Sequence, residues 1–256
     1  MKEIKASFKD SKFMSKENIE YINLIGQRFM EGPGTLVDKL DCFPKYTTRG
    51  AIARFMVRYE IFKKVLEIQG SVIDCGVLFG GSLMTWAQLS AILEPANHQR
   101  KVIGFDTFTG FPSITEKDES KTEFKYRKEG SFSINSYDDL QEVIKIYDMT
   151  RYLNHLEKVE IVKGDICSTV PQYIEDNPHL VVSLLHLDVD IYEPTLKALE
   201  CFVPRMPKGA IIVFDELNAA VFPGETRALM EYMGDLSGLK VKRFPFGTFV
   251  SYMEIE

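Results

Sequence analysis

Residues 184–195 read LLHLDVDIYEPT, an apolar run that ends in two acidic residues, Asp188 and Asp190. Such a run is typical of a strand in the core of a sheet, where an unpartnered charge costs several kcal/mol. Carboxylates at the end of a buried strand therefore usually meet a cation, hydrogen-bond donors or a ligand. The pattern recurs at 210–216, AIIVFDE, where a second apolar run ends in another acidic pair. Two neighbouring strand ends of this kind predict a metal site or an acid–base site.

Apolar runs and helical patterns alternate on both sides of this stretch. Strands are predicted at 72–75, 101–105, 159–163, 180–188 and 210–215, and helices at 51–68, 82–93, 171–176, 193–202 and 225–236. Short apolar strands separated by helices are typical of a parallel sheet covered on both faces. The last two predicted strands, 240–245 and 248–254, are too close for a crossover helix and must pair antiparallel. The sequence therefore predicts an α/β fold: a doubly wound, Rossmann-like, seven-stranded sheet, mostly parallel with an antiparallel last strand, with helices on both faces.

Two polar segments depart from this pattern. Residues 1–50 have only scattered apolar positions and a Gly-Pro-Gly break at 32–34, which predicts a helical flap ahead of the main domain at 51–256. The segment 112–140 is an insertion after a predicted strand end, and it is highly charged over 115–139. This insertion is either a mobile lid over the site or a solvated loop, and the sequence leaves both open.

Composition excludes several classes of protein. The 256 residues are 45% hydrophobic and 27% charged, which is enough for one large α/β core. The net charge of -6 and the absence of a Lys/Arg cluster argue against a nucleic-acid partner. The four cysteines are far apart, no signal-peptide pattern opens the chain, and no apolar stretch reaches about 18 residues. We expect a cytoplasmic protein without a membrane partner. The protruding flap is compatible with a homodimer, and the sequence leaves the oligomeric state open.

A glycine-rich turn, DCGVLFGGS at 74–82, joins the first strand of the main domain to its helix. Gly76 and Gly80 let the backbone approach a ligand, and the helix N-terminus adds a partial positive charge. Asp106 ends the next strand, where a carboxylate accepts hydrogen bonds from two ribose hydroxyls. The spacing differs from G-x-G-x-x-G, and Asp74 within the turn would repel a pyrophosphate. Both features disfavour NAD and favour a cofactor with a cationic amino-acid end, such as S-adenosylmethionine.

Four motifs follow one another along the chain: GVLFGG at 76–81, DTFTGFP at 106–112, KGDICSTVP at 163–171 and LDVDIYEPT at 187–195. In this order they resemble the macrocin O-methyltransferase family of class I S-adenosylmethionine-dependent methyltransferases, which also contains noviose O-methyltransferases. The resemblance spans residues 70–235. It implies an enzyme that methylates a hydroxyl of a sugar or sugar-containing product, and it leaves the identity of the acceptor open.

The same resemblance assigns roles to the acids. The family's metal-binding aspartate falls on Asp188 and its proposed general base on Asp190. In the family, two acids after the next strand complete the coordination of the divalent ion, which is usually Mg²⁺. Here these acids are Asp215 and Glu216. Because Glu216 replaces an aspartate and its carboxylate reaches further, a metal-independent methyltransferase stays an alternative. Asp190 could instead cap the helix at 193–202.

A metal and a base are expected to act together. A sugar hydroxyl is a weak nucleophile, whereas the methyl sulfonium is already a strong electrophile. A cation lowers the pKa of the hydroxyl, and a nearby aspartate takes the proton. An unperturbed aspartate, with a pKa of about 3.9, would be a poor base alone.

Further residues are expected around the cofactor. The complete expected set is Thr48, Asp74, Gly76, Gly80, Ser82, Asp106, Thr107, Gly164, Asp165 and Asp188. Thr48 precedes the first helix of the main domain and suits the methionine carboxylate, although it could equally be a helix cap. Asp165 follows the third strand, where this fold places the adenine.

Two residues and two rival functions stay open. His186 shares a strand face with Asp188 and is either a satisfied core group or a catalytic residue. Arg227 could hold an anionic part of the acceptor or pair with Glu225. The rivals are an NAD-dependent oxidoreductase on the same sheet and a binding module without catalysis.

Overall fold

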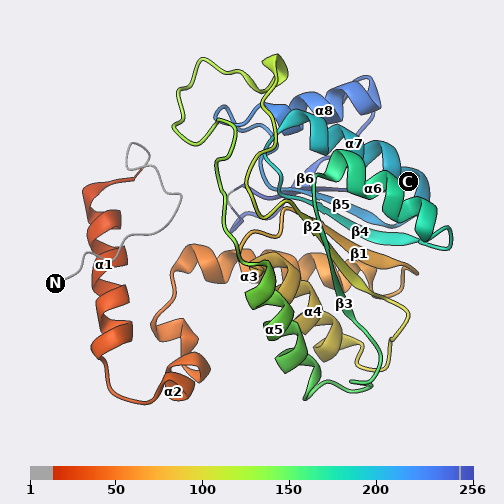
Figure 1. Cartoon of the computed structure of the whole chain (residues 1–256). Coiled ribbons are helices and arrows are strands. Elements are labelled where there is room, and N and C mark those ends of the chain that lie inside the picture. Colours follow the sequence, from red (N-terminus) through yellow and green to blue (C-terminus); the bar gives the residue numbers. More distant parts are fainter. Residues whose placement is uncertain (1–13, 248) are drawn as a thin grey trace.

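A seven-stranded sheet forms the middle layer of the computed structural model, which describes residues 14–247 and 249–256 (Figure 1). The strand order is β3-β2-β1-β4-β5-β7-β6. The strands are β1 (Ser71–Cys75), β2 (Val102–Asp106), β3 (Val159–Lys163), β4 (Val182–Leu187), β5 (Ile211–Phe214), β6 (Lys242–Arg243) and β7 (Ser251–Glu254). Strands β1 to β5 pair in parallel, and β7 lies antiparallel between β5 and β6. The predicted mixed sheet is confirmed, and its order reverses between β1 and β4, where doubly wound sheets bind ligands.

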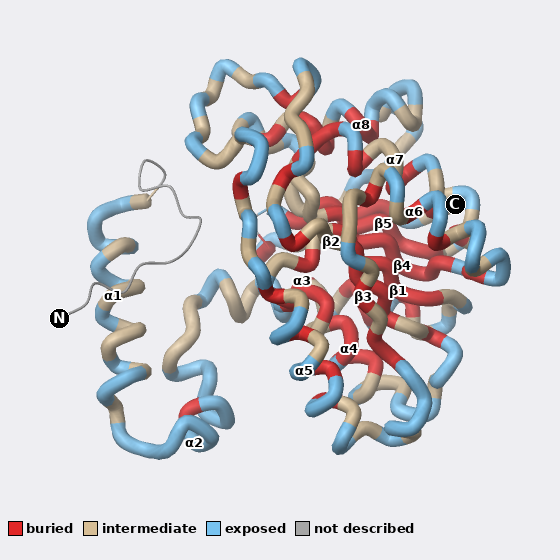
Figure 2. The backbone as a smooth tube through the Cα atoms, in the orientation of Figure 1, coloured by how far each residue is buried: buried red, intermediate tan, exposed pale blue. Residues whose placement is uncertain are grey.

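Helices cover both faces of the sheet (Figure 1). One face carries α3 (Arg49–Val65), α4 (Gly81–Leu93) and α5 (Tyr137–Asp148), and the other carries α6 (Ile166–Asp176), α7 (Tyr192–Phe202) and α8 (Gly224–Met233). The first face buries Phe62 and Trp86, and the second buries Phe105 and Phe202. Because both faces are covered, the central strands are buried along their length, as Figure 2 shows.

Two helices differ from the prediction. Helix α5 was not expected, because it follows the charged insertion, yet Leu140, Ile144 and Tyr147 recur at helical spacing and are buried. Helix α6 begins at Ile166 and not at Pro171, since the side chain of Asp165 accepts a hydrogen bond from the Cys167 N–H at 2.9 Å and caps the helix there. Proline favours the first position of a helix, which explains the late predicted start. Strands β6 and β7 are also shorter than predicted.

Residues 16–47, here called the N-terminal arm, stand apart from the sheet (Figure 1). The arm contains α1 (Lys16–Glu31), α2 (Leu36–Asp41) and a short 3₁₀ turn (Phe43–Lys45). Its helices hold each other, because Lys39 Nζ donates a hydrogen bond to the Phe29 carbonyl at 2.6 Å. No residue of α1 is buried. Residues 1–13 of the predicted flap, and Thr248 in the last predicted strand, lie outside the described residues.

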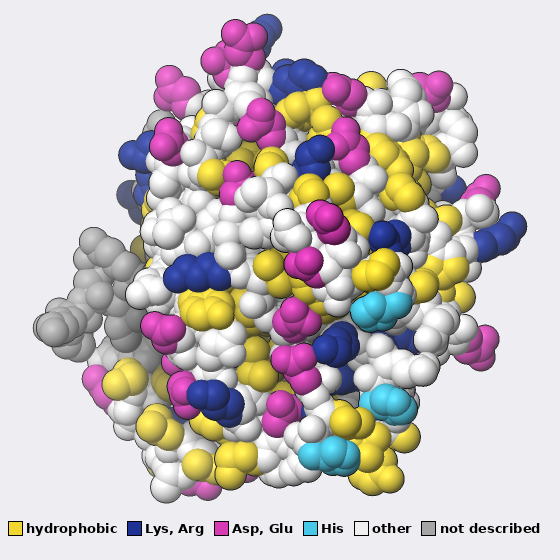
Figure 3. Space-filling view, turned by 45° about the vertical axis from the view of Figure 1, so that its right-hand side comes forward, with side chains coloured by type: hydrophobic (Ala, Val, Ile, Leu, Met, Phe, Trp, Pro, Cys, Tyr) yellow, Lys and Arg dark blue, Asp and Glu magenta, His cyan; other side chains and the backbone are white. Residues whose placement is uncertain are grey.

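Three observations bear on location and partners. None of the helices in the described part of the chain combines the length and the apolar character that crossing a bilayer requires. All four cysteines are free. On the face that Figure 3 shows, Lys and Arg side chains are scattered among Asp and Glu without a continuous basic patch. The cytoplasmic location, the homodimer and the lack of a nucleic-acid partner stay predictions.

Candidate active site

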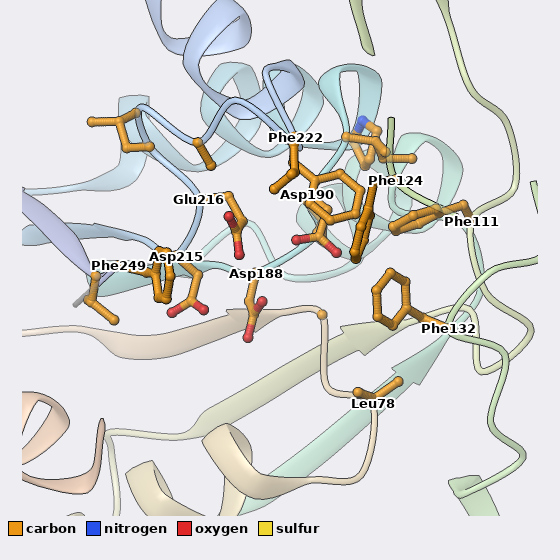
Figure 4. A pocket seen from close by; sticks show the side chains of 18 of the residues that line it. Leu78, Phe111, Phe124, Phe132, Asp188, Asp190, Asp215, Glu216, Phe222 and Phe249 are labelled. Atoms are coloured by element: carbon orange, nitrogen blue, oxygen red, sulfur yellow. The ribbon is translucent and has the colours of Figure 1, made fainter. Parts of the chain in front are cut away.

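Four carboxylates gather at the ends of β4 and β5, in a cavity of about 970 Å³ (Figure 4). Asp188 and Asp190 follow β4, and Asp215 and Glu216 follow β5. Ligand atoms of His186, Asp188 and Asp215 lie within 4.8 Å of one another. The carboxyl ends of these parallel strands meet at one edge of the sheet, so the structure brings together the two acidic pairs that are far apart in the sequence.

The backbone approaches closely at this edge. The Asp188 N–H donates to the Cys75 carbonyl at 2.9 Å, continuing the pairing of β1 with β4 beyond the strands. Gly76 has a φ of +95°, and a Cβ at this position would lie 1.9 Å from the Asp188 carbonyl oxygen. Only glycine fits here, because any side chain would push the two strand ends apart.

Asp190 has a left-handed backbone, with a φ of 64°. It does not cap α7: the N-cap residue is Ile191, and no side chain at that position makes a capping hydrogen bond. A non-glycine residue in this region is strained by roughly 1–3 kcal/mol, and such strain collects at functional sites. The conformation turns the Asp190 side chain toward the other three acids (Figure 4).

His186 lies between the buried Asp74 and Asp215 of the acidic cluster. It is 1% exposed, and its Nδ1 lies 2.5 Å from Asp74 Oδ1. Ser82 Oγ donates to the other oxygen of Asp74 at 2.8 Å. On the opposite side of the ring, Nε2 is 4.0 Å from Asp215 Oδ1, which is too long for a hydrogen bond but close enough for electrostatic attraction. Burial lowers the pKa of His186, but the charge of Asp74 and the proximity of Asp215 outweigh burial and raise it to about 9.

The carboxylates repel one another. Burial first, and then the neighbouring acids, raise the pKa of Glu216 to about 8 and that of Asp188 and Asp190 above the usual range. Burial favours a higher pKa for Asp215 as well. The opposing effect of His186, with smaller contributions from Arg58 and Arg54, is stronger and lowers the pKa below its usual value.

The donor set fits a divalent cation. Asp215 Oδ1 is buried and has no hydrogen-bond partner among the described residues. Carboxylate oxygens are the ligands that Mg²⁺ prefers. A cation at this point would satisfy the orphaned oxygen and relieve the repulsion among the acids.

Several residues expected at the cofactor line the same cavity. Gly76, Asp106, Thr107, Asp165 and Asp188 are among the lining residues. Asp106 accepts the N–H groups of Leu78 at 2.8 Å and of Phe108 at 2.6 Å. Burial raises the pKa of Asp106, and these backbone hydrogen bonds oppose the rise.

Other expected cofactor residues are not among the residues that line the cavity. Asp74 is fully buried, and both of its oxygens are bonded to His186 and Ser82, so neither acid nor serine faces the cavity. Thr48 is the N-cap of α3, where its hydroxyl oxygen accepts the Ala51 N–H at 3.1 Å.

Gly80 and Gly164 also lie outside the cavity lining of the described chain. A Cβ at Gly80 would lie 2.1 Å from Leu140, and one at Gly164 would lie 2.6 Å from Thr169. Both glycines have positive φ and shape the backbone of turns that follow strands.

Four phenylalanines form an aromatic wall beside the acids (Figure 4). Phe124 and Phe132 belong to the insertion, Phe111 directly precedes it, and Phe222 precedes α8. Neighbouring ring centroids are 5.3 Å apart for Phe111 and Phe132 and also for Phe124 and Phe222. Sequence reasoning missed this wall, although three phenylalanines in or beside so charged a segment were a visible signal.

The insertion is docked on the segment between β5 and α8. Arg127 donates to the Val221 carbonyl at 2.6 Å, and Arg227 donates to the Lys117 carbonyl at 2.6 Å. None of the ion pairs in the described part of the chain joins Arg227 to Glu225, and its other expected role, toward an anionic part of the acceptor, stays a prediction. Glu225 is fully buried and accepts the Glu216 N–H at 3.0 Å. Burial raises the pKa of Glu225 well above its usual range.

Comparison with known proteins agrees with this geometry. Residues 53–235 match the macrocin O-methyltransferase (TylF) family. The crystal structure of CalS11, a calicheamicin methyltransferase, superposes with a TM-score of 0.90 at 28% identity, covering 98% of both chains. The apo structure of CalS11, described as TDP-rhamnose 3'-O-methyltransferase, gives 0.81 at 28% identity over 94% of this chain and 95% of that one.

A more distant structure supports the fold alone: the O-methyltransferase NovP, with a TM-score of 0.62 at 18% identity over 80% of both chains. No curated protein sequence matches the chain. Since the family match covers well over half of the residues, the chain belongs to the macrocin O-methyltransferase (TylF) family and is an S-adenosylmethionine-dependent O-methyltransferase.

Proposed function

We propose that this enzyme methylates a hydroxyl of a sugar or sugar-bearing product with the help of a divalent cation, of which Mg²⁺ is the first candidate. The observation that carries the proposal is the four-acid cluster with an orphaned, buried oxygen on Asp215. The cluster lies between residues of the glycine-rich turn and the aromatic wall. CalS11, which is described as acting on TDP-rhamnose, supports a sugar acceptor.

The four acids would have two different roles in activating the acceptor hydroxyl. Asp188, Asp215 and Glu216 would hold the cation, which when bound lowers the pKa of a nearby hydroxyl. Asp190 would take the hydroxyl proton, and its burial, the largest cause of its raised pKa, would make it a stronger proton acceptor than an exposed aspartate. Holding the acceptor oxygen in line with the methyl group contributes about 7 kcal/mol or more to catalysis.

The cofactor would lie at the β1 and β2 end of the cavity. Asp106 would accept the ribose hydroxyls, since each of its oxygens keeps a lone pair beyond the backbone bond it already accepts. Gly76, Thr107 and Asp165 would contact the cofactor directly. Asp74, Ser82, Thr48, Gly80 and Gly164 would support this pocket from behind.

The acceptor would lie against the aromatic wall. Sites for small molecules combine apolar and aromatic surface with a few polar groups that fix orientation. The phenylalanines would pack on the apolar face of a sugar ring or of an attached group, and the acids would orient its hydroxyl. In this proposal residues 51–256 form the methyltransferase domain, and 112–140 form its lid.

Activity on a panel of nucleotide sugars and neutral glycosides tests the proposal. We expect turnover to be lost in excess EDTA and restored by Mg²⁺. Asp188→Ala should abolish turnover while binding of S-adenosylhomocysteine persists, and Asp139→Ala, which removes an exposed acid, is the matched control. Full activity in excess EDTA would instead favour a metal-independent methyltransferase.

The cofactor assignment has its own test. S-adenosylhomocysteine at a hundredfold excess over its Kd should stabilise the fold by about 2.7 kcal/mol. A melting temperature that rises with NAD but not with S-adenosylhomocysteine would overturn the assignment.

A further inference from the structure

Helix α7 begins beside the catalytic acids without a cap of its own. Its N-cap residue, Ile191, offers no side-chain hydrogen bond. The first N–H groups of a helix have no partner within the helix. Here the Tyr192 N–H is donated to Asp118 Oδ1 at 2.7 Å, across 74 residues of sequence. The insertion thus supplies the cap that α7 lacks.

Both carboxylate oxygens of Asp118 accept hydrogen bonds where the insertion meets the start of α7, a contact here called the junction. Asp118 is 1% exposed. Its second oxygen accepts both the N–H of Thr115, at 2.9 Å, and the hydroxyl of Thr115, at 2.8 Å. The carboxylate therefore bonds the short 3₁₀ turn of the insertion (Glu116–Asp118) to the start of α7, and Asp118 is not among the residues that line the cavity.

The start of α8 closes the junction. A Cβ at Gly224 would lie 2.2 Å from Asp118 Oδ1 and 2.6 Å from the Tyr192 nitrogen. The next residue, Glu225, accepts the Glu216 N–H. The junction is therefore connected to both pairs of acids. Tyr192 links it to the segment after β4, which carries Asp190, and Glu225 links it to the segment after β5, which carries Glu216.

We propose that Asp118 is a positioning residue for methyl transfer. Asp190 lies two residues before the capped N–H and has a strained, left-handed backbone. Such a conformation persists only where the surrounding structure holds it. By fixing Tyr192, Asp118 holds Asp190 toward the acceptor. The inference rests on the proposed role of Asp190 as the base.

Asp118→Ala is the first test. Misplacing a catalytic group by about 1 Å can cost about 100-fold in rate. We expect kcat to fall by up to about that factor, with the Kd for S-adenosylhomocysteine unchanged. Asp118→Asn keeps one oxygen that can accept the Tyr192 N–H but turns its amide group toward the Thr115 N–H, so it should restore part of kcat. An unchanged kcat in Asp118→Ala would overturn the proposal.

Asp38→Ala is the matched control. Asp38 accepts the N–H and the hydroxyl of Thr35, both at 2.7 Å, which is the same local turn that Asp118 makes with Thr115. Asp38 is exposed and belongs to the arm. This variant should keep the wild-type kcat, and an equal loss in both variants would count against a specific role for Asp118.

A backbone variant tests the bond from the other side. Tyr192→Pro removes the donor N–H together with the ring, and the helix start should tolerate it, because proline is accepted at the first position of a helix and Ile191 is already extended, at φ −111° and ψ 158°. Tyr192→Ala keeps the N–H and controls for the lost ring. We expect the proline variant to lose kcat as Asp118→Ala does. If Asp118→Ala does not fold at the assay temperature, the Tyr192 pair decides the question.

A double-mutant cycle separates this inference from the proposed function. If Asp118 acts through Asp190, Asp118→Ala should lower kcat no further in an Asp190→Asn background. Fully multiplicative losses would overturn the inference and leave the role of Asp190 intact. Full activity of Asp190→Asn alone would instead remove the base from the proposed function.

Discussion

The N-terminal arm and the charged insertion contain the same local motif in different surroundings. Thr35 and Asp38 form a capping box in the arm, and Thr115 and Asp118 form one in the insertion. In the arm the aspartate is exposed and, among the residues that the structure describes, bonds to its own turn alone. In the insertion the aspartate is buried and also binds α7. The same four-residue pattern is a local turn in one place and also binds the start of α7 in the other.

Packing explains the difference. Two phenylalanines of the insertion, Phe124 and Phe132, pack against Phe222 within the aromatic wall. Helix α1 instead exposes Tyr21, Leu24 and Met30 and buries none of its residues. A capping box sets the start of a helical turn, whereas the apolar residues around it decide whether the turn docks.

The largest effect on stability should come from the aromatic wall. Phe222 is 4% exposed, so Phe222→Ala should lower the free energy of unfolding by about 3–5 kcal/mol and raise the KM for the acceptor. Phe29→Ala in the arm removes one edge-on contact with Tyr46, which is worth about 1 kcal/mol. Chemical denaturation measures both. Equal losses would mean that the arm is packed as firmly as the insertion.

A smaller effect is expected from two glycines that pack against the capping-box aspartates. Gly224 lies beside Asp118, and Gly34 lies beside Asp38. Gly224→Ala crowds the junction of the insertion with α7 and should cost about 1–3 kcal/mol and lower kcat. Gly34→Ala places alanine at a φ of +96° beside Asp38, with a comparable cost of roughly 1–2 kcal/mol. Only the Gly224 variant should lose kcat at a temperature where both are folded. Loss of kcat in both would break the distinction between the two regions.

The smallest effect is expected from the surface of the insertion. Lys117 forms an ion pair with Glu231, but the two side chains are 48% and 50% exposed. Solvent screens such a pair, so Glu231→Gln should leave the melting temperature and kcat unchanged. A clear loss in thermal melting would show that surface charge, and not the buried junction, holds the insertion.

The sequence predicted those features that follow from the ends of strands. Asp188 and Asp215 could be placed together because parallel strands present their carboxyl ends at one edge. The antiparallel β7 followed from a connection too short for a crossover helix. These inferences need only the order of the elements along the chain.

Other features depend on partners that the sequence does not reveal. Asp74 was expected to face the cofactor, but it is the register partner of His186 in β4 and turns inward to it. The bond from Asp118 to Tyr192 joins residues 74 positions apart, and neither residue carries a signal of the other. Such contacts depend on register and docking, which local patterns do not encode.

The contact between Gly76 and Asp188 limits how enzymes of this design can diversify. Main chain meets main chain there, so any side chain in place of Gly76 would widen the gap between the ends of β1 and β4. Side chains of the insertion and of the segment before α8 line the rest of the cavity, so substitutions there can change its shape without moving these strand ends. The reacting centre then keeps constant dimensions while its enclosure evolves.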